Sequence, residues 1–405
     1  MKPVYERCCG IDVHKKIVVA CFRNGRNAEL RQFGTLTKNL KELGNWLVEN
    51  GCQMVAMEST SSYWKPIYNI LELLGLNIIV VNAHHMKNVP GRKTDIKDAE
   101  WIADLLQHGL LKPSYIPDKE QREIREIVRY RKSMIEERAR ETNRLEKVLE
   151  GANIKLSSFV SSLTGMSSRK LIEHSLVGQV SEENIGDLIH SSMQSKKAEL
   201  LDALDGVFSA TQKLLVRAIL DHIDDMSKRI KELDDIINDQ MKSYEDDIKK
   251  LDEITGVGKR SAEVIISEIG HDMSRFPTDA HLCSWAGLCP SNNESAGKRK
   301  SGKSSKGNRH LKCILIQCAK SAKRNKDSFF FAQYQRLVVR RGANRATVAV
   351  AHSMMIAIYH ILKNKVPFKD LGANYYSRFN SGAKAQYYLR KLQELGMSVP
   401  VSLTT

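Results

Sequence analysis

Short apolar runs alternate with amphipathic segments over the first 115 or so residues. The clusters CCGIDV and KIVVACF flank the polar pair His14-Lys15, a pattern that predicts two paired strands. The elements expected after them alternate between helix and strand: a helix at 38–50, the strand QMVAM, a helix at 62–74, the strand NIIVV at 77–81 and a helix at 95–108. Alternating strands and helices predict an α/β domain at 1–117, with helices packed on a central sheet.

The pattern changes to long helices at 118–250. The segment 118–150 is highly charged and has a sparse apolar stripe, while apolar residues from Ile219 to Tyr244 repeat at alternating spacings of four and three. This spacing predicts a coiled-coil seam about four heptads long. The seam could pair with 118–150 in the same chain or join two protomers, and the sequence leaves both open. The Ser-rich stretch 157–195 is expected to form a small loop-rich insertion.

Residues 251–375 form a mainly α-helical C-terminal domain in this interpretation, followed by a polar tail at 376–405. The domain opens with ITGVGKRSAEVIISEIG, which has the glycine turn of a helix-hairpin-helix-like element. In such elements, backbone amides at the turn and the start of the next helix bind a DNA phosphate. The candidate phosphate-binding residues are Gly256, Gly258, Lys259 and Arg260. A turn that only packs two helices together is the open alternative.

Net charge favours a polyanionic partner. The chain has 63 Lys and Arg against 47 Asp and Glu, a net charge of +16. Nucleic acid fits this excess better than a membrane surface, because we expect no apolar run of membrane-spanning length and no signal peptide. The expected location is therefore the cytoplasm. The eight cysteines form no CxxC pair and no zinc-like spacing, so no chemistry is assigned to them.

Four carboxylates lie where the predicted sheet meets its helices. Asp12 interrupts an apolar strand, and Glu58 ends the strand QMVAM. Asp95 and Asp98 lie three residues apart on one predicted helix and therefore face the same side. Taken singly, the last three could be helix caps or first-turn acids. As a set, the four carboxylates can hold two divalent ions, and Mg²⁺ prefers such oxygen ligands.

A basic stretch rich in Gly and Ser follows at 291–309. Its acids are limited to Glu294, and small residues interleave the cations, so backbone can approach a phosphate closely. The cations expected to bind nucleic acid are Lys298, Arg299, Lys300, Lys303, Lys306 and Arg309, with Lys312 just beyond. A serine here could attack phosphorus, since nearby cations would stabilise its alkoxide. The candidates are Ser295, Ser301, Ser304 and Ser305, and the residues alone favour phosphate binding over nucleophilic attack.

The motifs GIDVHKK, MESTSSYW and KTDIKDAEWIADLLQHG resemble the N-terminal domain of the insertion sequence one-ten family of transposases. The region from ITGVGKRSAEV to the basic run, and then RRGANRATVAVAHSMM, resembles the C-terminal domain of that family. The resemblance covers about 8–145 and 251–375.

The resemblance implies an RNase H-like fold with a DEDD set, a coiled-coil region and a helical domain with a catalytic serine. Carried over to this chain, the acids are Asp12, Glu58, Asp95 and Asp98, and the serine is Ser295. The family commonly has Gly-Gly where this chain has Ala296-Gly297, so Ser301 stays in reserve.

The function implied is an RNA-guided DNA recombinase that excises and inserts its own mobile element. The implied partners are double-stranded DNA at the element ends and target, a guide (bridge) RNA, and further copies of the chain in a dimer or tetramer. The implied cofactor is Mg²⁺, the intermediate a serine–DNA linkage, and the location the bacterial or archaeal nucleoid. The alternatives are a structure-selective endonuclease that uses metal-activated water and a non-catalytic nucleic-acid-binding protein.

Overall fold

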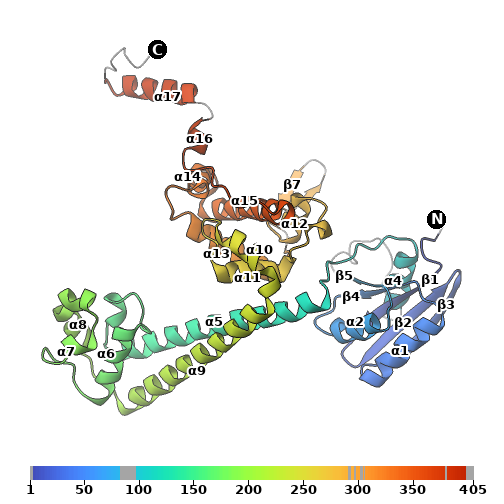
Figure 1. The fold of residues 1–405 in the computed structure, drawn as a ribbon, viewed down its shortest axis with the longest axis horizontal. Coiled ribbons are helices and arrows are strands. Elements are labelled where there is room, and N and C mark those ends of the chain that lie inside the picture. The colour runs from blue at the N-terminus through green and yellow to red at the C-terminus, as the bar shows by residue number, and fades with distance from the viewer. Residues whose placement is uncertain are drawn as a thin grey trace. The chain divides into compact units, whose positions relative to one another are not determined.

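The computed structural model describes residues 3–82, 97–290, 293–295, 298–301, 304, 306–378 and 381–397. The chain divides into two compact units, Met1–Ile116 and Pro117–Thr405 (Figure 1). The first is a mixed α/β unit and the second is largely helical, so the prediction of an α/β sheet followed by helices is confirmed. The finer division of the second unit at residues 250 and 375 stays a prediction.

The first unit is a five-stranded sheet in the order β3-β2-β1-β4-β5. Its elements are β1 (Arg7–Val13), β2 (Ile17–Asn24), β3 (Asn27–Gly34), α1 (Thr37–Glu49), β4 (Met54–Glu58), α2 (Trp64–Leu73), β5 (Ile78–Val81) and α4 (Lys97–Gln107). Strands β1, β2 and β3 pair antiparallel, whereas β4 runs parallel to both β1 and β5. The order of strands and helices expected from the sequence is therefore present, with one strand added.

The added strand is β3, at the edge of the sheet. It follows a tight turn in which Gly25 has φ +59°, and it pairs with β2 along its whole length. Six of its eight side chains are exposed, and Phe33 is the one buried. An edge strand of this kind shows no apolar alternation, so the hydrophobic pattern could not predict it.

Helices cover both faces of the sheet. Alternate residues of β1 and β4, such as Ile11 and Met57, pack with α1 and α2 in one core. The opposite face, including Cys8 and Ala56, packs against α4. Gly10 lies directly under α4, because a Cβ there would come within 2.4 Å of the Ala99 carbonyl oxygen and 2.2 Å of the Ala103 nitrogen. The absence of a side chain at Gly10 lets α4 approach β1 closely.

The second unit contains two long helices and a series of shorter ones. Its described helices are α5 (Lys119–Gly151), α6 (Met166–Val177), α7 (Ile185–Leu188), α8 (Lys197–Leu204), α9 (Ala210–Gln240), α10 (Glu245–Asp252), α11 (Lys259–Ile269), α12 (Asp279–Trp285), α13 (Arg309–Ala322), α14 (Phe329–Arg341), α15 (Ala343–Asn364), α16 (Tyr375–Arg378) and α17 (Ser381–Glu394). Its described strands are β6 (Asn293–Ser295) and β7 (Lys298–Ser301), which form an antiparallel pair.

Helices α5 and α9 pack against each other in opposite directions, as the contacts Arg131–Asp234 and Arg138–Ser227 show. The heptad positions Ile223, Ile230 and Ile237 are buried within the chain, each at 3% exposure or less. The sequence left open whether this seam pairs with 118–150 of the same chain or with a second protomer. In the structure it packs against α5 of the same chain. Each helix begins at a side-chain cap, Asp118 for α5 and a Ser209–Gln212 capping box for α9.

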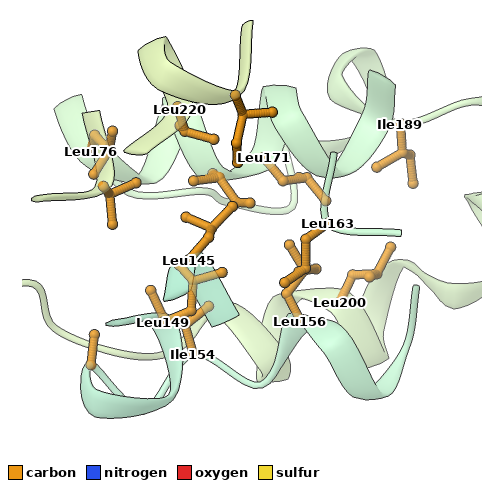
Figure 2. Close-up of a cluster of buried hydrophobic side chains, with 14 of the residues drawn as sticks. Leu145, Leu149, Ile154, Leu156, Leu163, Leu171, Leu176, Ile189, Leu200 and Leu220 are labelled. Atoms are coloured by element: carbon orange, nitrogen blue, oxygen red, sulfur yellow. The ribbon is translucent and has the colours of Figure 1, made fainter. Parts of the chain in front are cut away.

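The Ser-rich stretch 157–195 contains short helices as well as the expected loops. It forms α6, α7 and short 3₁₀ turns, and together with α8 it covers the end of the α5–α9 pair. Leu163, Leu171 and Ile189 from this stretch join Leu149 and Leu220 of the long helices in one buried cluster (Figure 2). The apolar residues are spaced by short helices and turns, so no single period was visible in the sequence.

Helix α15 corrects an expectation from the sequence. By length and composition it is apolar enough to cross a membrane, and it alone passes that test in the described parts of the chain. However, 56% of its apolar window is buried inside the second unit, where residues such as Met354 and Ile358 are fully enclosed. This burial is typical of the central helix of a helical core.

The intramolecular packing of α5 and α9 predicts that Ile230 and Ile236 respond differently to the same substitution. Ile230→Asp places a charge at a position that is 2% exposed and should destabilise the protein by about 3–5 kcal/mol. Ile236→Asp is the matched control on the same helix, because Ile236 is 45% exposed, and should cost less than about 1 kcal/mol. Urea unfolding followed by circular dichroism measures both. Equal midpoints would contradict the packing.

The close approach of α4 to β1 predicts that Gly10→Ala is destabilising. The added methyl group would overlap backbone atoms of α4 and should cost about 1–3 kcal/mol, since backbone cannot move aside as a side chain can. Gly178→Ala is the control, because a Cβ there meets nothing within 4 Å. Thermal unfolding of both variants provides the measurement, and a wild-type Tm for Gly10→Ala would refute the contact.

Candidate carboxylate site and serine hairpin

Asp12 and Glu58 lie on neighbouring strands at the same level. The parallel pairing of β1 with β4 ends at Ile11 opposite Met57, so the next residue of each strand is one of the two acids. Both acids lie two residues after a position that packs under α4, Gly10 in β1 and Ala56 in β4. Because side chains alternate along a strand, both carboxylates belong to the face that α4 covers. Adjacent strands are about 4.8 Å apart, which brings the two acids close together.

Asp98 lies in the first turn of α4. Its neighbour Ala99 lies directly over Gly10. Gly10 is two residues before Asp12 on β1. The start of α4 is therefore at the end of the sheet where β1 carries Asp12. The fourth predicted acid, Asp95, lies outside the described residues. Among the residues that are described, no three Asp, Glu, His or Cys side chains converge closely enough to hold a metal ion.

Two side chains that contact these acids were not predicted from the sequence. His14 Nε2 lies 2.9 Å from Asp12 Oδ2, and the Thr60 hydroxyl donates a hydrogen bond of 3.3 Å to Glu58 Oε1. Both partners are two residues from the acid that they contact, in the turns that follow β1 and β4. The motifs GIDVHKK and MEST contained that spacing, but a spacing of two does not reveal a contact without the turn geometry.

The oxygen-rich donor set fits Mg²⁺, which is held by carboxylates and shares its remaining positions with phosphate oxygens. Asp12, Glu58 and Asp98 provide such oxygens on one side of the sheet. All three are partly buried, with Asp12 and Glu58 on the sheet and Asp98 in the helix that covers the rest of that face.

Ser295 lies at the end of β6 and pairs with Lys298, the first residue of β7. We call the segment 293–301 the serine hairpin. Ala296 and Gly297, which follow Ser295 in the sequence, lie outside the described residues, as do Lys303 and Ser305. Ser301 pairs with Asn293 at the opposite end of the hairpin, and the Ser304 hydroxyl accepts a hydrogen bond of 2.6 Å from Lys312. Ser304 is thus engaged with a cation, and Ser295 is the candidate serine next to the turn.

Residues before and after the hairpin contact each other and the neighbouring helices. Gly307 packs tightly on Gly287, since a Cβ added to Gly307 would lie 2.3 Å from the backbone nitrogen of Gly287. The backbone N–H of Asn308 donates a hydrogen bond to the Trp285 carbonyl. The Asn308 side chain caps α13 and also donates a hydrogen bond of 2.7 Å to Glu268. Gly307 and Asn308 therefore have a defined position.

Glu268 is fully buried, yet it is ionised. Burial by itself would raise the pKa of Glu268, but Arg129 and Arg125 and the Asn308 amide outweigh it, so the pKa lies below its usual value. Arg129 binds both carboxylate oxygens, at 2.7 and 2.8 Å. The sequence did not indicate a role for this residue, because an acid in the apolar run AEVIISEIG gives no sign of its distant arginine partners.

The predicted phosphate-binding turn is present between α10 and α11. Gly256 has φ +88°, and a Cβ there would meet backbone of α13 at 2.5 Å, so this glycine serves a close contact between helices. Gly258 is open and begins α11. Lys259 donates to Asn238, and Arg260 pairs with Asp234. These contacts favour the packing alternative for the turn, and phosphate binding by the four residues stays a prediction.

The remaining predicted nucleic-acid contacts lie in or near the hairpin. Lys298, Arg299 and Lys300 are in β7, while Lys306 and Arg309 are exposed after it. The cysteines belong to a different environment. Burial raises the pKa of Cys8 and of Cys283 to about 12, so these thiols stay protonated at neutral pH and are poor nucleophiles.

Comparison with known proteins finds a transposase family match in each of the two parts of the chain. Residues 9–154 match a family described as "Transposase", and residues 248–335 match the "Transposase IS116/IS110/IS902 family". A protein of Sinorhizobium fredii (strain NBRC 101917 / NGR234) named "Putative transposase y4qE" is 29% identical over 142 residues. That alignment covers 32% of this chain and 35% of the relative, about a third of its length. The two family matches cover more than half of the chain, which therefore belongs to the IS110 family of transposases.

Proposed function

We propose that this chain is an RNA-guided DNA recombinase that cuts and rejoins DNA through a serine–DNA intermediate. The observation that carries the proposal is that Asp12 and Glu58 follow the last paired residues of β1 and β4 on the face of the sheet covered by α4, with Asp98 at the start of that helix. Carboxylates are costly on a half-buried sheet face unless a cation or donor satisfies them. The sheet order, an antiparallel β1–β2–β3 followed by parallel β4 and β5, supports the RNase H-like fold that the resemblance implies.

Asp12, Glu58, Asp95 and Asp98 would hold Mg²⁺, one or two ions, at the scissile phosphate. When bound there, Mg²⁺ supplies Lewis-acid stabilisation of the phosphate oxygens during phosphoryl transfer. His14 and Thr60 orient the carboxylates of Asp12 and Glu58, which limits the cost of bringing two acids together.

Ser295 is the proposed nucleophile. Its oxygen attacks phosphorus and forms a phosphoserine bond, while the bond to the departing strand breaks and that strand leaves as a hydroxyl. A hydroxyl of the incoming strand then attacks the phosphoserine, rejoins the DNA and returns the serine. The energy of the phosphodiester is kept throughout, so the reaction requires no nucleotide cofactor, and the cations of β7 would stabilise the negative transition state.

The proposed partners are duplex DNA at the element ends and target, a guide RNA, and further copies of the chain. The heptad seam of α9 is used within the chain, so a dimer or tetramer would form through another surface. The proposed location is the cytoplasm, in association with the nucleoid.

A structure-selective endonuclease is the second candidate. It is favoured by the chain position of the acids, since all four lie in the first unit and Ser295 lies in the second. A nuclease that uses metal-activated water needs only the first set. A protein that merely binds nucleic acid has no need of acids at all four positions.

The proposal predicts that Asp12→Asn and Asp98→Asn each reduce Mg²⁺-dependent strand cleavage by at least about 100-fold, because each removes a metal ligand. Asp104→Asn is the control, since Asp104 lies on the same helix but pairs with Arg23. DNA binding should be unchanged in all three variants. Cleavage assays on a labelled duplex, with and without Mg²⁺, measure the effect. Wild-type cleavage by either of the first two variants would contradict the carboxylate assignment.

A further inference from the structure

Helix α14 and the start of α15 carry a group of arginines that the proposed reaction does not use. Arg336 and Arg340 lie one turn apart on α14, and Arg341 and Arg345 flank the glycine that joins the two helices. We call these four residues the arginine surface. All four are exposed, and so is Val339 between them, at 87%.

The arginine surface lacks neutralising acids. The sequence has no Asp or Glu between Asp327 and Asp370, so neither α14 nor α15 contributes a carboxylate. None of the four arginines forms an ion pair with a carboxylate of the described residues. By contrast, some exposed cations elsewhere in the same unit have acid partners on their own helix, as Arg229 has Asp225 and Lys249 has Glu245.

Aromatic rings contact one of these arginines and a nearby lysine. The Arg336 guanidinium lies 4.7 Å from the centre of the Tyr376 ring, and Lys323 Nζ lies 4.6 Å from that of Tyr334. Tyr376 is in turn held by stacking on Phe329. A ring orders a cation without cancelling its charge, so the positive potential of this face is preserved. Four like charges repel one another, and that cost is offset when a polyanion binds.

We propose that the arginine surface binds the phosphate backbone of double-stranded DNA, as a contact separate from the serine hairpin. The choice of DNA rests on the proposed function, because duplex DNA is its substrate. The choice of a duplex rests on the rings, since single-strand binding uses open aromatic faces for base stacking, whereas a cation covers one face of Tyr334 and Tyr376 lies between Arg336 and the stacked Phe329. A 13-residue helix is about 20 Å long, which spans on the order of ten phosphates of a duplex.

The test is the salt dependence of binding by the full-length chain to a labelled duplex of arbitrary sequence, in EDTA so that no cleavage occurs. Each phosphate contact contributes about 0.9 to the slope of log affinity against log salt. Replacing all four arginines with Gln should therefore lower the slope by about 3 to 4. Arg336 also packs on Tyr376, so a second variant that changes only Arg340, Arg341 and Arg345 should lower it by about 2 to 3 without touching that contact.

The matched control replaces four exposed cations that have acid partners, Lys119, Arg229, Lys242 and Lys249, and loses the same total charge. Its slope should stay at the wild-type value. An equal fall in the control, or no fall in the arginine variants, would overturn the proposal. The same slopes are measured with single-stranded DNA and with duplex RNA. An equal fall in slope on single-stranded DNA, or a fall confined to RNA, would overturn the assignment to duplex DNA. Because the assay measures binding alone, it gives its answer even if the chain proves unable to recombine DNA.

Discussion

The second unit depends on a set of buried ion pairs that joins α5 and α9 to α11. Arg131 is 2% exposed and binds Glu263 at 2.6 Å and Asp234 at 2.8 Å. Two residues earlier on α5, Arg129 binds the buried Glu268 with two hydrogen bonds. Arg131, Glu263 and Glu268 are the buried members, and leaving one of them unpaired would cost several kcal/mol, which favours the arrangement of helices that pairs them. Apolar side chains alone would tolerate a shift along the helices far more readily.

One of these ion pairs also contacts a residue near the serine hairpin. Glu268 also holds Asn308, which caps α13 directly after the serine hairpin and is tied to Trp285 before it. The arginines of α5 thereby fix the position of Asn308 and the start of α13, which follow the hairpin in the chain. In the first unit, Gly10 has the corresponding role, because its missing side chain lets α4 come close enough to bring Asp98 toward Asp12. Each proposed group thus depends on packing some distance away from it.

Local periodicity predicted most of the elements and part of the candidate site. Strands β1, β4 and β5 are buried on both faces, and their short apolar runs were visible, as was the strand position of Asp12. The exposed edge strand β3 and the helices at 157–195 were not, since their residues show no single period. Long-range partners were beyond the reach of the sequence. No spacing indicates that Glu268 meets Arg129, or that the heptads of α9 close on α5 rather than on a second chain.

The central claim is that Ser295 forms a covalent bond with DNA, and the most direct measurement is the isolation of that bond. Full-length protein would be trapped on a nicked target duplex in Mg²⁺, denatured and digested, and the peptides analysed by mass spectrometry. The account predicts a nucleotide attached to the peptide containing Ser295, lost in Ser295→Ala and in Asp12→Asn but kept in Ser301→Ala. DNA cut without any adduct, by wild-type and Ser295→Ala protein alike, would contradict it and assign the cleavage to metal-activated water.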